Sequence, residues 1–178
     1  MNRLTSLIHP VQIGGILALS LAAVGCGSSV DHDSAVKVMN LALTGTVAAD
    51  NQTVSVNLNP NGGTVTASLT NLLGTGTATV DGSLTHKGTL TTSSLVVALD
   101  DWSDPQQSIK LTGSLHESGS FSSQLPLLGD VKLTGALQST GDINASVDFD
   151  LEGTYSLNGF KVTGDVGGQS LGTIQVTL

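Results

Sequence analysis

The feature that most constrains this chain is the one-by-one alternation of apolar and polar side chains. In DINASVDFDLEG, the apolar residues Ile143, Ala145, Val147, Phe149 and Leu151 alternate with polar or acidic ones. Successive side chains of an extended strand point to opposite faces, so this pattern is typical of a strand with one buried face. We therefore expect a half-buried strand in this segment.

The same alternation recurs elsewhere and predicts an all-β domain. After Cys26 we find no window in which apolar residues recur at helical spacing for long enough to bury a helix. Thr, Ser and Val are abundant, and Gly marks the breaks between the alternating segments. Three further strands are predicted in IKLTGSLH with Ile109, Leu111 and Leu115, in VKLTGALQ with Val131, Leu133 and Leu137, and in TVSVNLN with Val54, Val56 and Leu58.

A weak internal repeat indicates how the strands connect. GSLHESGSFSSQL, which begins at Gly113, aligns without gaps with GALQSTGDINASV, which begins at Gly135. We interpret each unit as a strand end, a tight turn closed by glycine and a strand start, because glycine tolerates the positive φ that hairpin turns need. HKG, LNG and VGG are interpreted as turns in the same way. Strands joined by such turns pair antiparallel, so we predict an up-and-down meander of about ten strands.

The predicted sheet needs a cover for its apolar face and protection for its edges. With no helix expected, we predict that the meander closes into a barrel, and a β-sandwich is the alternative. Glycine also recurs inside the expected strands, in LTG at 43, 111 and 133 and in VTG at 162. Glycine within a strand often marks a bend, which suits a strongly curved sheet.

The first residues follow a different pattern. One cation, Arg3, precedes the apolar stretch VQIGGILALSLAAVG, which ends at Cys26 and gives way to small polar residues. This order is typical of a secretory signal peptide, and the stretch is shorter than the ~20 apolar residues of a membrane span. We therefore predict a signal peptide at residues 1–25.

The residues Ala23-Val24-Gly25-Cys26 resemble the lipobox of bacterial lipoproteins, although the place of the usual leucine holds Ala23. The resemblance implies that the thiol is acylated and that Cys26 becomes the first residue of the mature protein. Ordinary signal cleavage that leaves a free thiol is the alternative, but a lone cysteine in an exported chain cannot form an intramolecular disulfide. By the same resemblance, Gly27 favours sorting to the outer membrane if the host is Gram-negative.

These patterns divide the chain into a signal peptide at 1–25, a lipidated cysteine with a flexible tether at 26–34, and a single all-β domain at 35–178. Attachment to the membrane through the lipid at Cys26 would place the protein in the cell envelope. The net charge is −8, and the chain has no cluster of Lys and Arg. We therefore expect no binding to nucleic acid.

The candidate site residues are few. LDDWSDPQQ brings Asp100, Asp101 and Asp104 together in the sequence, and closely spaced carboxylates suit a hard cation such as calcium. The alternative is a long loop in which aspartate favours turns. Trp102 on such a loop is a candidate contact for a ligand or partner, unless it folds back to cap the barrel.

With one deletion, GSLTHKGTLTTSSL from Gly82 also aligns with the repeat. Two histidines, His86 and His116, therefore occupy corresponding turns and would meet at one rim if the turns converge. Zinc needs three or four ligands, so this pair alone does not predict a metal site. The chain has no G-x-S-x-G nucleophile motif, and we expect no catalytic residue and no cofactor. The sequence predicts a non-enzymatic, lipid-anchored envelope protein with a structural or interaction domain. The alternative is a carrier that holds a small apolar ligand or lipid inside the barrel.

Overall fold

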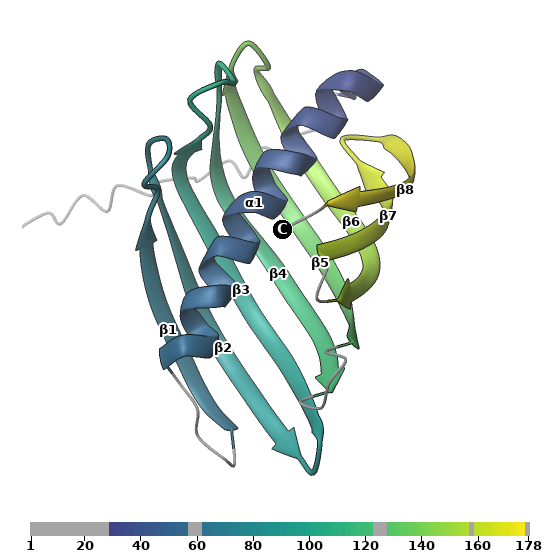
Figure 1. Ribbon diagram of the computed structural model, residues 1–178. Helices are drawn as coiled ribbons and strands as arrows, with labels where there is room; N and C mark the ends of the chain where they lie inside the picture. The colour runs from purple at the N-terminus through teal and green to yellow at the C-terminus, as the bar shows by residue number, and fades with distance from the viewer. Residues whose placement is uncertain (1–28, 57–61, 123–127, 157–158, 177–178) are drawn as a thin grey trace, which may run out of the picture.

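The computed structural model describes residues 29–56, 62–122, 128–156 and 159–176. The signal peptide and Cys26 therefore lie outside the described residues. Within them, one helix precedes eight strands (Figure 1). The elements are α1 His32–Val56, β1 Gly62–Thr70, β2 Thr77–Lys87, β3 Leu90–Ser103, β4 Ile109–Ser122, β5 Leu128–Gly141, β6 Ala145–Ser156, β7 Gly159–Val166 and β8 Gln169–Val176.

The strands form one sheet in the order β1 to β8, and each strand pairs antiparallel with the next. The predicted antiparallel meander is confirmed, with eight strands in place of about ten. β1 and β8 remain the two edges of the sheet, so the prediction of a closed barrel is wrong. The sandwich alternative is also wrong, because all eight strands belong to a single sheet. The physical reason is a helix, which covers the apolar face.

The helix α1 crosses one face of the sheet diagonally, from the side of β7 and β8 at its start to β1 and β2 at its end (Figure 1). The sequence analysis did not predict it. Its end takes in residues 53–56 of TVSVNLN, so the strand expected there is wrong, and residues 57–59 of that segment lie outside the described residues. One face of α1 is buried, and its members recur at the three- and four-residue spacing of an amphipathic helix. They are Ala35, Val38, Met39, Ala42, Leu43, Thr46 and Val47, and Leu41, Gly45 and Ala49 are buried beside them.

An aspartate fixes the start of this helix. The backbone N–H of Ser34 donates to Asp31 Oδ1 at 2.8 Å, and that of Ala35 donates to the Asp31 carbonyl at 2.9 Å. A side-chain oxygen that accepts from the first turn is the usual N-cap, and it satisfies a donor that has no partner within the helix. Regular structure thus begins at His32, within the segment 26–34 that we assigned to a flexible tether.

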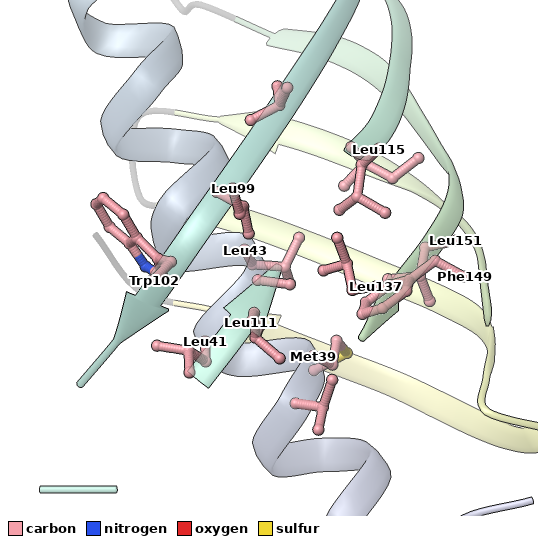
Figure 2. Packing of buried hydrophobic residues seen from close by; sticks show 14 of the residues in the cluster. Met39, Leu41, Leu43, Leu99, Trp102, Leu111, Leu115, Leu137, Phe149 and Leu151 are labelled. Carbon is pink, nitrogen blue, oxygen red and sulfur yellow. The ribbon is translucent and has the colours of Figure 1, made fainter. Parts of the chain in front are cut away.

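The core lies between α1 and the inner face of the sheet, which we define as the face that α1 covers. Figure 2 shows its side chains packed between the helix and the strands, with Trp102 at one side of the cluster. The alternating residues of β4, β5 and β6 point into this core, which confirms the strands predicted there. The inner-face residues of these three strands include Ile109, Leu111, Leu115, Val131, Leu133, Leu137, Ala145, Val147, Phe149 and Leu151.

Two of the in-strand glycines allow neighbouring strands to approach closely. Gly113 and Gly135 have φ of +139° and +144°, and a Cβ on them would lie 2.8 Å and 2.6 Å from carbonyl oxygens of the paired strand. The LTG sequences at 111 and 133 therefore lie within strands, as predicted. The LTG at 43 does not, since Gly45 lies inside α1.

The predicted turns had mixed outcomes. HKG and VGG are turns, at residues 88–89 and 167–168. ESG, residues 117–119 and the expected turn of the repeat unit that begins at Gly113, is not a turn, because β4 continues through it to Ser122. The turn predicted at LNG includes residues 157–158, which lie outside the described residues. A glycine within a bent strand and a glycine that closes a hairpin occur in similar short sequences. The sequence alone therefore did not distinguish the two cases at ESG.

Candidate functional site

One end of the sheet carries four connections and also the start of the described chain. The strands alternate in direction, so the connections after every odd-numbered strand lie at this end (Figure 1). The backbone N–H of Val30 donates to the Gly167 carbonyl at 3.3 Å, which ties the start of the chain to the same end. We call this end the amino-terminal rim, formed by residues 29–31, 71–76, 104–108, 142–144 and 167–168.

The loop 71–76 at this rim is held by a dense set of hydrogen bonds. Asn71 Oδ1 accepts from the N–H groups of Leu73 and Gly74 at 3.1 and 2.9 Å, while its Nδ2 donates to the Ser103 carbonyl at 2.6 Å. The hydroxyls of Thr75 and Ser103 are 2.8 Å apart, and the Thr75 N–H donates to Ser103 Oγ at 3.1 Å. These bonds fix the loop to the end of β3.

This fixed loop presents two leucines to solvent. Leu72 and Leu73 are 89% and 85% exposed. Among the described residues, one other large apolar side chain is exposed, Leu90, and it follows the β2–β3 turn at the opposite end of the sheet. Single exposed apolar residues are common, whereas these two are adjacent and belong to a loop that is fixed by hydrogen bonds.

The acidic segment LDDW forms a β-bulge. The pairing of β3 with β4 shifts between Leu99 and Trp102, and Asp101 has φ of +51°. A bulge adds one residue to a strand and so changes which face the following side chains take. Both aspartates, Asp100 and Asp101, are exposed, and Trp102 turns inward and is only 3% exposed.

Trp102 packs against the helix. A Cβ added to Gly45 of α1 would lie 3.0 Å from the indole Nε1 and 2.9 Å from Leu99 Cδ2, so glycine at this position leaves the space that the ring fills. Nε1 is buried and has no hydrogen-bond partner among the described residues. The structure therefore places Trp102 on β3 in the helix–sheet interface, and of the two predicted possibilities it favours a ring that folds inward over an exposed contact on a loop.

The structure does not bring the three aspartates together as a cation site. Asp101 Oδ2 lies 3.6 Å from Lys110 Nζ, and Asp104 Oδ1 accepts from the Gln106 N–H at 2.6 Å in a local turn. In the described ranges, no group of three or more His, Cys, Asp and Glu side chains lies close enough to hold a metal ion. The bulge and the turn account for the acidic residues Asp100, Asp101 and Asp104.

The two histidines lie on opposite faces of the sheet. His86 is on β2, and its Nδ1 is 2.7 Å from Thr91 Oγ1 on the inner face. His116 is exposed on β4 and pairs with Val96, an outer-face position. Their similar places in the repeat therefore do not bring them together.

Sequence analysis missed a pair of carboxyl groups between α1 and β4. Glu117 is 8% exposed and points to the inner face, where its side chain is hydrogen bonded to that of Asp50 from the helix. Oε2 of Glu117 has no hydrogen-bond partner in the described part of the chain. The signal for this pair was present, because Glu117 continues the alternation of Leu111 and Leu115, and Asp50 lies four residues after the buried Thr46.

Burial controls the electrostatics of this pair. Burial raises the pKa of Asp50 well above its ordinary value, and the charge of Glu117 and the hydrogen bond to it raise it further. Burial also raises the pKa of Glu117, while the hydrogen bond from Asp50 lowers it in part. Ionising both of two buried carboxyls in contact has a large free-energy cost, because like charges repel and neither is solvated by water. Ionisation of both carboxyls is therefore disfavoured at this position, which joins the helix to the sheet.

The outer face of the sheet, opposite α1, carries an open depression of about 480 Å³. Its lining mixes both signs of charge with small polar residues, and Lys132 Nζ is 3.2 Å from Asp150 Oδ1 beside it. No single ligand chemistry follows from this mixture. The charged lining residues are Asp130, Lys132 and Glu152.

No family model matches the chain, and neither a curated protein nor a solved structure matches it.

Proposed function

We propose that this protein is a non-enzymatic, lipid-anchored protein of the cell envelope, in which the helix-covered sheet serves a structural or interaction role. The observation that carries the proposal is the lipobox-like sequence Ala23-Val24-Gly25-Cys26, which holds the only cysteine of the chain. Among the described residues α1 is the one helix, and it lacks the long apolar stretch that a membrane crossing requires. An acyl group on Cys26 would supply the attachment.

The start of the domain suits a short connection to the membrane. Three residues separate Cys26 from Val30. The four Cα-to-Cα steps of an extended chain span at most about 3.5 Å each, so the link reaches about 14 Å. Val30 is bonded to Gly167, and Asp31 caps the helix immediately afterwards. A lipid on Cys26 would therefore hold the amino-terminal rim next to the membrane surface. In a Gram-negative host, Gly27 would direct the protein to the outer membrane.

The test compares Cys26→Ser with Ser28→Ala in the full chain, expressed in a bacterium that processes lipoproteins. We expect the wild type and Ser28→Ala to carry acyl mass on residue 26 and to sediment with membranes. Cys26→Ser should lack that mass and leave the membrane fraction. A wild-type product with an unmodified Cys26, or one that remains in the supernatant, would contradict the proposal.

A carrier of an apolar ligand is the second candidate, although the barrel interior expected for it is replaced by an open sheet covered by α1. The observation that favours it is the Asp50–Glu117 pair, because two buried carboxyls in contact are costly to ionise and would weaken the cover of the apolar face where they lie. Native mass spectrometry of the detergent-extracted full chain tests this candidate. A lipid adduct beyond the acyl mass on Cys26 would support carriage, and the mass of the acylated chain alone would contradict it.

A further inference from the structure

We propose that Leu72 and Leu73 form a second membrane contact, which inserts into the bilayer that holds the lipid on Cys26. This inference rests on the proposed function, since it requires the anchor. Beyond the lipid anchor, the inference assigns a membrane-contacting surface to the domain itself and implies a defined orientation of the sheet on the membrane. The partner is the apolar region of a lipid bilayer.

The first argument is position. Loop 71–76 follows β1 and turn 167–168 follows β7, so both lie at the amino-terminal rim (Figure 1). Ser29 and Val30 lie against that turn. The chain that leads back to Cys26 therefore leaves the domain at the end that presents the two leucines, and Leu90 lies at the other end.

The second argument is the geometry of attachment. The first and seventh strands are six strand spacings apart, which corresponds to about 29 Å across a flat sheet. An anchor beside β7 and an apolar contact beside β1 would hold the rim at two separated points. The strands would then stand on the membrane with turn 88–89 directed away from it. The lipid also keeps the loop at high local concentration near the bilayer, so a small apolar contact suffices.

The third argument is the chemistry of the loop. The side chains of residues 70–77 carry no charge. The exposed Asp100 and Asp101 adjoin the loop through their backbone carbonyls, beside Thr75 and Gly76, and Asp31, Asp104 and Asp142 lie elsewhere on the same rim. Charged groups stay out of the apolar region of a bilayer and leucine enters it. Bonds from Asn71 and Ser103 hold the loop open before it meets a membrane, so little freedom is lost on insertion. The acidic neighbours favour zwitterionic lipid over anionic lipid.

The experiment uses the acylated full chain and takes advantage of its single native cysteine. Once Cys26 is acylated, a cysteine introduced by Leu73→Cys is the only free thiol and takes an NBD fluorophore. The matched control is Leu90→Cys, an exposed leucine at the opposite end. Both proteins are reconstituted in phosphatidylcholine vesicles whose acyl chains carry a nitroxide quencher. Intact mass confirms the acyl group on Cys26 before fluorescence is measured.

We expect the quencher to reduce NBD emission at position 73 at least threefold and at position 90 by less than a fifth. Leu72→Ser in the Leu73→Cys protein should weaken the quenching at 73, because the adjacent leucine contributes to insertion. Equal quenching at 73 and 90 in acylated protein would overturn the inference and leave the anchor intact. No quenching at 73 would also overturn it and indicate a protein partner for the leucines. A product without acyl mass would show instead that the proposed function itself has failed.

Discussion

The two faces of the sheet are built from the same strands and differ in what they contact. The inner face carries Val, Leu and Ile, takes up α1 and buries Glu117 in contact with Asp50. The outer face carries Thr, Ser, Asp and Lys, most of them exposed, and holds the ion pair between Lys132 and Asp150. Alternation alone produces both faces. Only the inner face depends on the size and protonation of individual side chains, so substitutions there should have much larger effects.

The largest expected effect comes from removing a helix side chain at the centre of the core. Leu43 is 1% exposed, and its truncation leaves a cavity that the surrounding strands fill only in part. We expect Leu43→Ala to lower the free energy of unfolding by about 3–4 kcal/mol, measured by urea denaturation. Thr66→Ala on the outer face should change it by less than about 0.5 kcal/mol. Similar losses for the two variants would remove the distinction between the faces.

The next effect concerns the fit of Trp102 against α1. Alanine in place of Gly45 gains about 1 kcal/mol of helix propensity, but its Cβ would lie 3.0 Å from the indole nitrogen. We expect Gly45→Ala to lower the free energy of unfolding by about 1–2 kcal/mol despite that gain, because the interface becomes overpacked. Thr44→Ala, at the exposed neighbouring position, is the control and should cost less than about 0.5 kcal/mol.

A double-mutant cycle identifies the cause of that loss. Trp102→Phe has a smaller ring and should cost less in the Gly45→Ala background than in the wild type, by about 0.5–1.5 kcal/mol. If the losses in the free energy of unfolding from the two substitutions simply add, Gly45 and Trp102 do not compete for space. The loss in Gly45→Ala would then have a cause other than overpacking against the ring.

The carboxyl pair makes the inner face sensitive to pH. The pKa values of Asp50 and Glu117 are raised in the folded protein, so over the interval above the ordinary carboxyl range it retains protons that the unfolded chain releases. The stability due to these groups is fully present at acidic pH and is lost as pH rises through their raised pKa values. We expect Asp50→Asn to flatten this decline and to raise the free energy of unfolding at pH 8 by about 1–2 kcal/mol, because the amide donates to an ionised Glu117.

Urea midpoints measured at intervals from about pH 5 to pH 8 provide the measurement, since the decline is expected above the ordinary carboxyl range. Asp130→Asn, at an exposed outer-face position, is the matched control and should keep the wild-type decline over this range. A wild-type protein that becomes more stable as pH rises over this interval would show that the pair is ionised in the folded state.

The sheet could be predicted from the sequence because alternation is a local pattern. Each of the segments around Leu111, Leu133 and Phe149 shows its buried face within about eight residues, and hairpin connections then imply antiparallel neighbours. Closure is not local. Whether a meander becomes a barrel depends on what covers its apolar face, and here that cover is a helix that precedes all eight strands and contacts strands at both edges of the sheet. Without α1, a barrel was the consistent solution.

The helix escaped prediction for physical reasons. Its interior contains Thr44, Gly45, Thr46 and Val47, all of them weak helix formers, and Val54 and Val56 alternate like a strand. Packing of small side chains against the sheet overrides these preferences. Once α1 was missed, its contacts were missed too, because Asp50 and Glu117 meet only across the helix–sheet interface. The bulge at Asp101 likewise depends on pairing with β4, so Trp102 was assigned to a loop.

The smallest expected effect lies on the outer face. Lys132 Nζ and Asp150 Oδ1 are 3.2 Å apart, but the two side chains are 52% and 68% exposed, so water and salt screen their attraction. We expect Lys132→Ala to lower the free energy of unfolding by less than about 1 kcal/mol, and the difference should shrink in 1 M salt. Glu152→Gln, which lies opposite Lys132 in the strand pairing, tests whether charge on this face matters beyond one pair. A loss above about 2 kcal/mol for Lys132→Ala would mean that the outer face has an ordered polar network of its own. The two faces would then differ in chemistry but no longer in how much their side chains contribute to the free energy of unfolding.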